Sequence, residues 1–260
     1  MLSYQHIYHA GNLADVQKHA LLAVALDYMC AKPKPLSYIE THSGRGLYDL
    51  KASEAQKTGE AEGGIGLAAH WFAPDHPYTR ARNTIRAQHG EQAYPGSPLI
   101  AQSLLRPDDR MHFAELHPQE FDALNIALGR GPRIYKQDGF EMAQAVCPPD
   151  PRRGLLMIDP SYEVKADYDR IPNTISKLHR KWNVGAITLW YPILRDALHK
   201  PMLQKLEAMD LPKTLRHEVR FPPVREGHRM AGSGMFFLNA PYGLETEAHW
   251  LSQKFETIGA

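Results

Sequence analysis

The sequence predicts an α/β protein with a seven-stranded, mostly parallel sheet that carries helices on both faces. Five short apolar segments alternate with segments of helical periodicity, which is typical of repeated βα units. Only a Pro/Gly-rich loop separates the last two predicted strands, 214–221 and 235–238. A parallel return needs a crossover of about a dozen residues, so these two strands should pair as an antiparallel hairpin.

Length and composition predict one domain over residues 1–260, because no Ser/Gly/Pro linker divides the chain. The net charge of +1 excludes a polycationic tail, so a nucleic acid would have to meet a local basic patch. Cys30 and Cys147 stand far apart, which predicts a reducing compartment and no zinc knuckle. Without a signal peptide or a membrane-length apolar run, we expect a soluble cytoplasmic protein. The fourteen histidines contain no His-Glu-x-x-His pair, and we predict no metal site.

The first helix should begin after Asn12, an N-cap residue with Asp15 three places on. Apolar residues spaced through 16–28 predict one apolar face, and Lys-Pro-Lys-Pro at 32–35 ends the helix. Lys18 and His19 lie early in it. Such residues are mostly solvated or half-buried, and their position alone makes neither of them a ligand.

A strand over 36–40 runs into Thr41-His42-Ser43-Gly44-Arg45-Gly46. Two glycines spaced by one residue permit a close backbone approach to a ligand, but a plain turn is about as common an origin for this pattern. Residues 51–93 then form a rather basic helical insertion, in which Arg80, Arg82 and Arg86 crowd one segment. That cluster is typical of a solvated helix face.

Two carboxylates follow predicted strands. Glu115 ends a strand over 111–116, where it can accept hydrogen bonds from ribose hydroxyls or be a merely exposed strand-end group. Asp138 follows a strand over 133–136 and can bind an adenine amino group or cap the next helix. Between these sites, Tyr94-Pro95-Gly96-Ser97-Pro98 predicts a tight turn into a helix over 99–105, and a further helix spans 119–128.

The stretch 155–162 combines a buried strand with polar residues at its carboxyl end. Its four apolar residues read as a strand buried on both faces, and Asp159-Pro160-Ser161-Tyr162 follows at the carboxyl end, where open α/β sheets bind ligands. An unpaired buried carboxylate is too costly for Asp159 to be a core residue. The alternative is that Asp159 caps the next helix and Tyr162 packs beneath it. Helices over 175–182 and 195–209 flank a strand over 184–190, and the hairpin loop carries Arg225, His228 and Arg229.

Taken together, the closing hairpin, the glycine turn, the acids after strands two and three, and Asp-Pro-x-Tyr after strand four resemble class I S-adenosylmethionine-dependent methyltransferases. The last motif resembles that of enzymes that methylate the adenine amino group. More segments, in order along nearly the whole chain, resemble the RlmJ family. They are Met1-Leu2-Ser3-Tyr4, His9-Ala10-Gly11-Asn12, Ala14-Asp15-Val16, Lys18-His19, Thr41-His42, Tyr94-Pro95-Gly96-Ser97-Pro98-Leu99-Ile100-Ala101, Glu115-Leu116-His117-Pro118, Asp138-Gly139-Phe140 and Leu189-Trp190-Tyr191-Pro192.

The resemblance implies methylation of the N6 amine of one adenine (adenine 2030 in the family) in 23S ribosomal RNA, with the base flipped into the Asp-Pro-Ser-Tyr loop. It implies S-adenosyl-L-methionine as cofactor, and a monomer whose partner is rRNA that is protein-free or early in assembly. The residues that it assigns are Asp159, Pro160 and Tyr162 to catalysis, His19, His42, Ser97, Glu115, Asp138, Gly139 and Asp159 to the cofactor, and Tyr4 and Lys18 to the RNA. Ser161 replaces the second proline of the family motif, and Arg45 replaces a small residue.

Two other functions stay open at the level of the sequence. A DNA adenine-N6 methyltransferase would share the Asp-Pro-x-Tyr chemistry. A non-catalytic cofactor-binding or RNA-binding scaffold is the alternative from another class. A nicotinamide oxidoreductase is disfavoured, because the third glycine of its turn is missing and a hairpin closes the sheet.

Overall fold

The computed structural model describes residues 4–222 and 230–258. Seven strands form one sheet in the order β5-β4-β1-β6-β7-β9-β8. These strands are β1 (Ser37–Glu40), β4 (Arg110–Ala114), β5 (Arg133–Tyr135), β6 (Gly154–Ile158), β7 (Ala186–Leu194), β8 (Leu215–Arg220) and β9 (Met230–Leu238). All neighbours pair in parallel except β7 with β9 and β8 with β9. The predicted sheet and its closing antiparallel hairpin are therefore confirmed.

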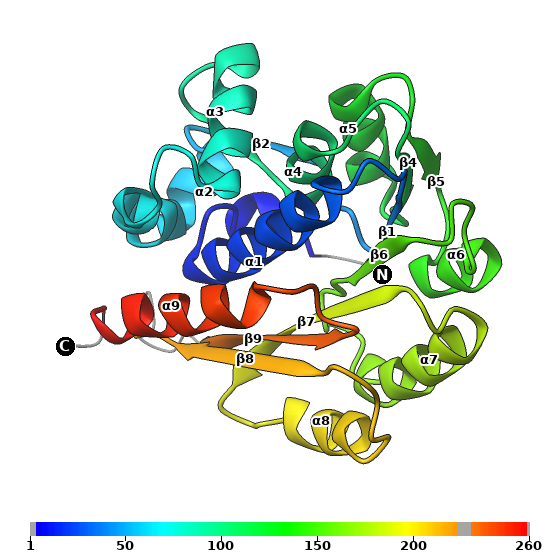
Figure 1. Cartoon of the computed structure of the whole chain (residues 1–260). Coiled ribbons are helices and arrows are strands. Elements are labelled where there is room, and N and C mark those ends of the chain that lie inside the picture. Colours follow the sequence, from blue (N-terminus) through cyan, green and yellow to red (C-terminus); the bar gives the residue numbers. More distant parts are fainter. Residues whose placement is uncertain (1–3, 223–229, 259–260) are drawn as a thin grey trace.

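Helices cover both faces of this sheet (Figure 1). One face packs against α1 (Leu13–Cys30), α4 (Ser97–Leu104) and α9 (Leu244–Glu256), and the other against α6 (Gly139–Val146), α7 (Asp167–Lys181) and α8 (His199–Glu207). Helix α5 (Pro118–Leu128) packs beside α4. Alternate residues of β6 serve the two cores: Leu155 and Met157 join one, and Leu156 and Ile158 the other. This alternation is what a strand buried on both faces requires.

Several predicted boundaries were wrong. Helix α7 begins at Asp167 rather than 175 and continues through Pro172, since Tyr168, Ile171 and Ile175 supply a buried stripe that outweighs one missing N–H. Helix α8 is shorter than predicted. Strand β9 begins at Met230 rather than 235, where small residues conceal the strand pattern; a Cβ on Gly234 would lie 2.2 Å from the Tyr191 ring.

Helix α1 starts as predicted, with the Asn12 side chain accepting a hydrogen bond from the Asp15 backbone N–H. The prediction of a single apolar face was wrong. Helix α1 is buried on nearly every side, because α3 (Pro77–His89), α4, α9 and the sheet surround it. Lys18 and His19 are consequently buried rather than solvated.

Residues 51–93 contain α2 (Ser53–Thr58), the π-helical turn Glu62–Gly66, the 3-10 turn Ala69–Trp71 and α3 (Pro77–His89). A two-stranded antiparallel ribbon that the sequence did not predict, β2 (Leu47–Asp49) with β3 (Ala93–Pro95), joins the two ends of this segment. Two arginines of the segment 51–93 contact other residues of the chain. Arg80 pairs with Asp27, and the Arg82 guanidinium lies over the Tyr78 ring. In the described part of the chain, no helix is long and apolar enough to cross a membrane.

Candidate active site

A cavity of about 530 Å³ opens at the carboxyl ends of the parallel strands. It lies where β1 and β6 adjoin and the strand order reverses, which is where open α/β sheets bind ligands. Every residue that the sequence and its resemblance single out for the site lines this cavity: Tyr4, Lys18, His19, His42, Ser97, Glu115, Asp138, Gly139, Asp159, Pro160 and Tyr162. The fold brings them together, and their individual roles stay predictions.

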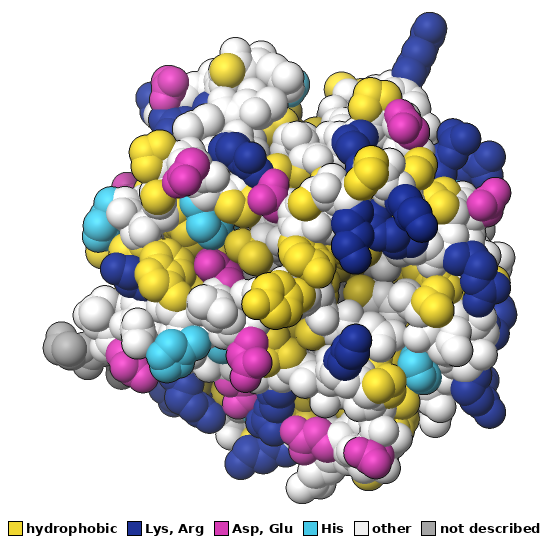
Figure 2. All heavy atoms as spheres, in the orientation of Figure 1, with side chains coloured by type: hydrophobic (Ala, Val, Ile, Leu, Met, Phe, Trp, Pro, Cys, Tyr) yellow, Lys and Arg dark blue, Asp and Glu magenta, His cyan; other side chains and the backbone are white. Residues whose placement is uncertain are grey.

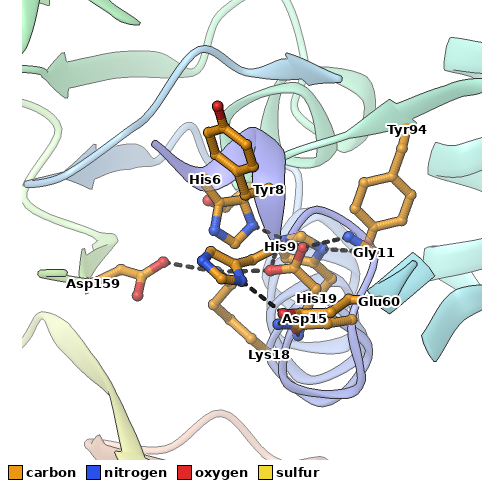
Figure 3. A network of polar contacts seen from close by, with 12 residues as sticks. His6, Tyr8, His9, Gly11, Asp15, Lys18, His19, Glu60, Tyr94 and Asp159 are labelled. Carbon is orange, nitrogen blue, oxygen red and sulfur yellow. Dashed lines mark hydrogen bonds and ion pairs between the residues drawn. The ribbon is translucent and has the colours of Figure 1, made fainter. Parts of the chain in front are cut away.

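Asp159 faces the cavity from the end of β6 and is held by a lysine from α1. The Lys18 Nζ lies 2.8 Å from Oδ2 of Asp159 and 3.1 Å from Oδ1 of Asp15 (Figure 3). Burial alone would lower the pKa of Lys18, but the two carboxylates raise it above its usual value. Asp159 does not cap α7, whose N-cap is Ala166. The capping alternative for Asp159 is therefore wrong.

Asp15, expected only as a capping partner, is the centre of this charge cluster. Its Oδ2 lies 2.9 Å from Nε2 of His6 and accepts a hydrogen bond from the Gly11 N–H. Burial opposes ionisation, yet His6 and Lys18 hold the pKa of Asp15 well below its usual value. The buried carboxylate thus anchors both the lysine that meets Asp159 and the N-terminal segment.

The N-terminal segment spans the cavity between two elements. The Tyr4 backbone N–H donates to Glu163, in the loop after β6, at 3.0 Å, and the Tyr4 ring stacks on His9 with 5.6 Å between ring centroids. Nδ1 of His9 lies 2.9 Å from Oε1 of Glu60. The segment over residues 51–93 therefore helps to place Tyr4 at the cavity.

Tyr162 combines packing with a position in the cavity wall. Its hydroxyl donates to the Trp190 carbonyl at 2.7 Å, and its ring centroid lies 4.7 Å from that of Tyr168. Its φ of +58° is unusual for a residue other than glycine and costs on the order of 1–3 kcal/mol. The alternative that Tyr162 packs beneath the next helix is confirmed, because its buried ring lies against Tyr168 of α7, and the same ring also lines the cavity.

Glu115 and the glycine turn are joined directly. The Gly44 N–H donates to Oε2 of Glu115 at 2.8 Å, and the His117 N–H donates to Oε1 at 2.7 Å. Burial raises the pKa of Glu115 and these backbone donors oppose the rise. The carboxylate is half-buried and fixed rather than an exposed strand-end group, and each oxygen keeps a lone pair for a further donor.

Asp138 caps α6 by accepting a hydrogen bond from the Glu141 N–H at 3.0 Å, as one of its two predicted roles requires. It also forms a bidentate pair with Arg170 of α7, at 2.8 and 3.1 Å. The Arg170 guanidinium lies 4.4 Å from the Phe140 ring centroid. Arg170 has no local signal in the sequence, because only the packing of α7 brings it to the cavity. The adenine contact of Asp138 stays a prediction.

Two histidines of the cavity are neutral near pH 7. Burial lowers the pKa of His19 to about 3 and that of His42 to about 4. Nδ1 of His19 lies 3.0 Å from the Tyr94 hydroxyl, and the His42 ring meets the Phe140 ring edge-on. Neutral imidazoles can present a donor or an acceptor to a polar ligand without repelling a positive charge.

Ser97, at the start of α4, contacts a buried acid that the sequence reasoning missed. Its hydroxyl lies 2.5 Å from Oε1 of Glu40, the last residue of β1, and the Tyr38 hydroxyl donates to Oε2 at 2.9 Å. An acidic residue at the end of a strand, directly before a glycine turn, was the signal that could have identified Glu40.

These residues fit a nucleoside that carries an amino-acid tail. The cavity volume falls within the usual range for small-molecule sites, roughly 300–1,000 Å³. A Cβ on Gly139 would lie 1.7 Å from the Thr41 carbonyl oxygen, so the start of α6 approaches the glycine turn as closely as the backbone permits. Fixed carboxylates suit ribose hydroxyls and an amine, and neutral imidazoles suit a cationic ligand.

The strand order and the cavity at its switch point define a class I methyltransferase fold. Residues 33–257 match the family model described as "Ribosomal RNA large subunit methyltransferase D, RlmJ". The chain is 37% identical to the ribosomal RNA large subunit methyltransferase J of Escherichia coli K12, over all of this chain and 96% of that protein. It is 38% identical to the protein of the same name from Haemophilus influenzae, over 95% of this chain and 90% of that one.

A solved structure of a protein from Legionella pneumophila is similar to this chain in both fold and sequence. It superposes with a TM-score of 0.85 at 34% identity and covers 96% of this chain and 94% of that one. The chain belongs to the RlmJ family of ribosomal RNA large subunit methyltransferases.

Proposed function

We propose that this protein transfers a methyl group from S-adenosylmethionine to the N6 amine of one adenine in 23S ribosomal RNA. Membership of the RlmJ family supports rRNA as the substrate. The observation that carries the choice of an amine acceptor is the position of Asp159, in the cavity wall beside Pro160 and Tyr162 and paired with Lys18.

The adenine amine is a poor nucleophile, because its lone pair is delocalised into the ring. In this proposal the Asp159 carboxylate and the Pro160 carbonyl each accept a hydrogen bond from one N–H of this amine. These two hydrogen bonds draw the nitrogen toward tetrahedral geometry. Lys18 occupies Oδ2 of Asp159, so we assign Oδ1 to the amine. After methyl transfer the nitrogen carries a positive charge and has to lose a proton. We assign Oδ1 of Asp159 as the acceptor of this proton.

S-adenosylmethionine supplies a methyl group that its sulfonium already activates. We assign its binding to His19, His42, Ser97, Glu115, Asp138 and Gly139, with Asp159 at the transfer end. Glu115 would accept from the ribose hydroxyls, and Asp138 from the adenine amine of the cofactor. The protein's contribution is to orient both partners and to exclude water.

The target base has to leave its helix to reach this cavity, and Tyr162 would give it a surface to stack on. Tyr4 remains the proposed RNA contact at the cavity entrance. Because Lys18 is buried beside Asp159, we restrict its proposed RNA contact to the flipped base. On the right of Figure 2, where Figure 1 places α5 and α6, Lys and Arg side chains lie close together on the surface. Such side chains can bind RNA phosphates. Arg225, His228 and Arg229 lie outside the described residues.

The proposal further comprises a monomer in the cytoplasm that acts on rRNA before ribosomal proteins cover it. It treats the chain as one domain with a helical insertion over 51–93. The chain aligns with 96% of the Escherichia coli methyltransferase J and with 90% of the Haemophilus influenzae protein of that name.

The test is transfer of labelled methyl to protein-free 23S rRNA that lacks the modification, beside duplex DNA, with the product nucleoside identified. N6-methyladenosine at one site in the RNA is expected. Asp159→Ala should abolish transfer and leave cofactor affinity within a few-fold, whereas Asp169→Ala, at an exposed ion pair with Lys205, should keep full activity. Label in DNA would make the protein a DNA adenine methyltransferase. Bound cofactor without any transfer would favour a scaffold.

A further inference from the structure

A carboxyl group lies directly behind the cavity wall and has no part in the chemistry above. Glu40 is fully buried, and Ser97 stands between it and the cavity. Glu40 is bound by two hydroxyls, Ser97 on Oε1 at 2.5 Å and Tyr38 on Oε2 at 2.9 Å. Ser97 is thus the polar link from this carboxyl to a ligand in the cavity.

The two protonation states of Glu40 give Ser97 opposite polarities. An ionised Glu40 accepts the Ser97 O–H, so the serine oxygen turns only lone pairs to the cavity. A protonated Glu40 can donate its own hydrogen to the serine oxygen, and the Ser97 O–H then points into the cavity as a donor.

We propose that Glu40 and Ser97 form a proton-linked switch in which Glu40 releases a proton to solvent when a cationic amino group binds to Ser97 in the cavity. This inference rests on the proposed function, since S-adenosylmethionine and its demethylated product both carry such an ammonium group. An ammonium has donors only, so it selects the state in which Ser97 accepts. Glu40 is a positioning residue, because it acts on the ligand through Ser97.

The surroundings of Glu40 favour its neutral form before binding. Burial raises the pKa of Glu40 to about 8, while Ser97 and Tyr38 oppose the rise. The charged groups that act on Glu40 are Asp159, from the end of β6, which raises its pKa, and Lys18, from α1, which lowers it. Lys18 is already bound by two carboxylates, so an incoming cation supplies the charge that Glu40 lacks.

The test is calorimetric titration of the full-length protein with S-adenosylhomocysteine at pH 7, in phosphate and in Tris, whose ionisation enthalpies differ. Close to one proton should be released per site. Release should fall to near zero in Glu40→Gln and persist in Glu141→Gln, which alters an exposed acid on α6. Ser97→Ala, which retains Glu40 and removes the link, should also lose most of the release.

A second readout needs no variant. Affinity for S-adenosylhomocysteine should rise nearly tenfold per pH unit from pH 6 to about pH 8 and then level off, at the pKa of Glu40 in the free protein. A flat affinity profile, or release that Glu40→Gln retains, would overturn the inference and leave the methyltransferase proposal intact. Absence of any binding to the unaltered protein would instead defeat the proposed function.

Discussion

The Lys18 Nζ lies 2.8 Å from Oδ2 of Asp159, across a sequence separation of 141 residues. Lys18 comes from a helix that is buried on nearly every side, and Asp159 comes from the loop at the end of β6. The pair occupies the wall of the cavity, so the residue proposed for catalysis is positioned by α1 as well as by its own strand.

Removal of this lysine should damage both stability and transfer. Lys18→Met leaves the carboxylates of Asp15 and Asp159 without their cation in a buried setting, which typically costs about 3–5 kcal/mol. We expect urea unfolding to show a loss of that order and kcat to fall by about 100-fold or more, the order of a lost transition-state contact. Lys205→Met breaks an exposed pair and is the control, with an expected cost below about 1 kcal/mol. Equal effects in the two variants would contradict the structural role of Lys18.

Glu115 should govern cofactor affinity rather than the transfer step. Its carboxylate is fixed by the Gly44 and His117 N–H groups, so Glu115→Ala removes the acceptor and leaves two backbone donors unpaired. Charge-assisted hydrogen bonds contribute about 1.5–3 kcal/mol each, which predicts a Kd for S-adenosylhomocysteine raised by about 10- to 100-fold. Calorimetry measures this directly, with Glu141→Ala as the control. An unchanged Kd would remove Glu115 from the cofactor site.

The close approach of α6 to the glycine turn should make Gly139 intolerant of a side chain. Gly139→Ala places a methyl group 1.7 Å from the Thr41 carbonyl oxygen, and the backbone has to shift. We expect a loss of about 1–3 kcal/mol or more in urea unfolding. A Cβ on Gly63 would have no heavy atom within 4 Å, so Gly63→Ala should change stability by less than about 0.5 kcal/mol. Similar midpoints for the two variants would show that α6 can move away freely.

The pH dependence of stability should carry the signature of Glu40. The pKa of Glu40 in the folded protein, about 8, lies above its usual value of 4.5. Between pH 4.5 and pH 8, Glu40 therefore keeps its proton in the folded protein and loses it in the unfolded chain. This contribution is fully present below pH 4.5 and is lost as pH rises to about 8, by at most about 1.4 kcal/mol per pH unit. Urea unfolding between pH 5 and 9 should therefore show the unaltered protein losing stability relative to Glu40→Gln up to pH 8. If the unfolding free energies of the unaltered protein and of Glu40→Gln changed in parallel with pH, the raised pKa of Glu40 would be contradicted.

Local patterns in the sequence determined the strands of the seven-stranded sheet, the closing hairpin and the carboxylates that follow strands, and the resemblance to a known family supplied the other residues that meet in the cavity. Apolar runs have only a few ways to be buried, the gap before β9 is too short for a crossover, and parallel strands end at one edge of the sheet. The Asn12 and Asp138 caps were predictable for the same reason, since each involves neighbours within three residues. Strand β9 and helix α7 were misjudged at one end, because packing outweighed glycine and proline.

Only the tertiary structure decided how the site is charged. The pairing of Lys18 with Asp159, the burial of Asp15, the contact of Glu40 with Ser97 and the pairing of Arg170 with Asp138 all join residues that are distant in the chain or enclosed by distant elements. The state of an ionisable group depends on how much water its neighbours exclude and on which charges they bring. Those neighbours are set by how the layers pack, which no local pattern in the sequence records.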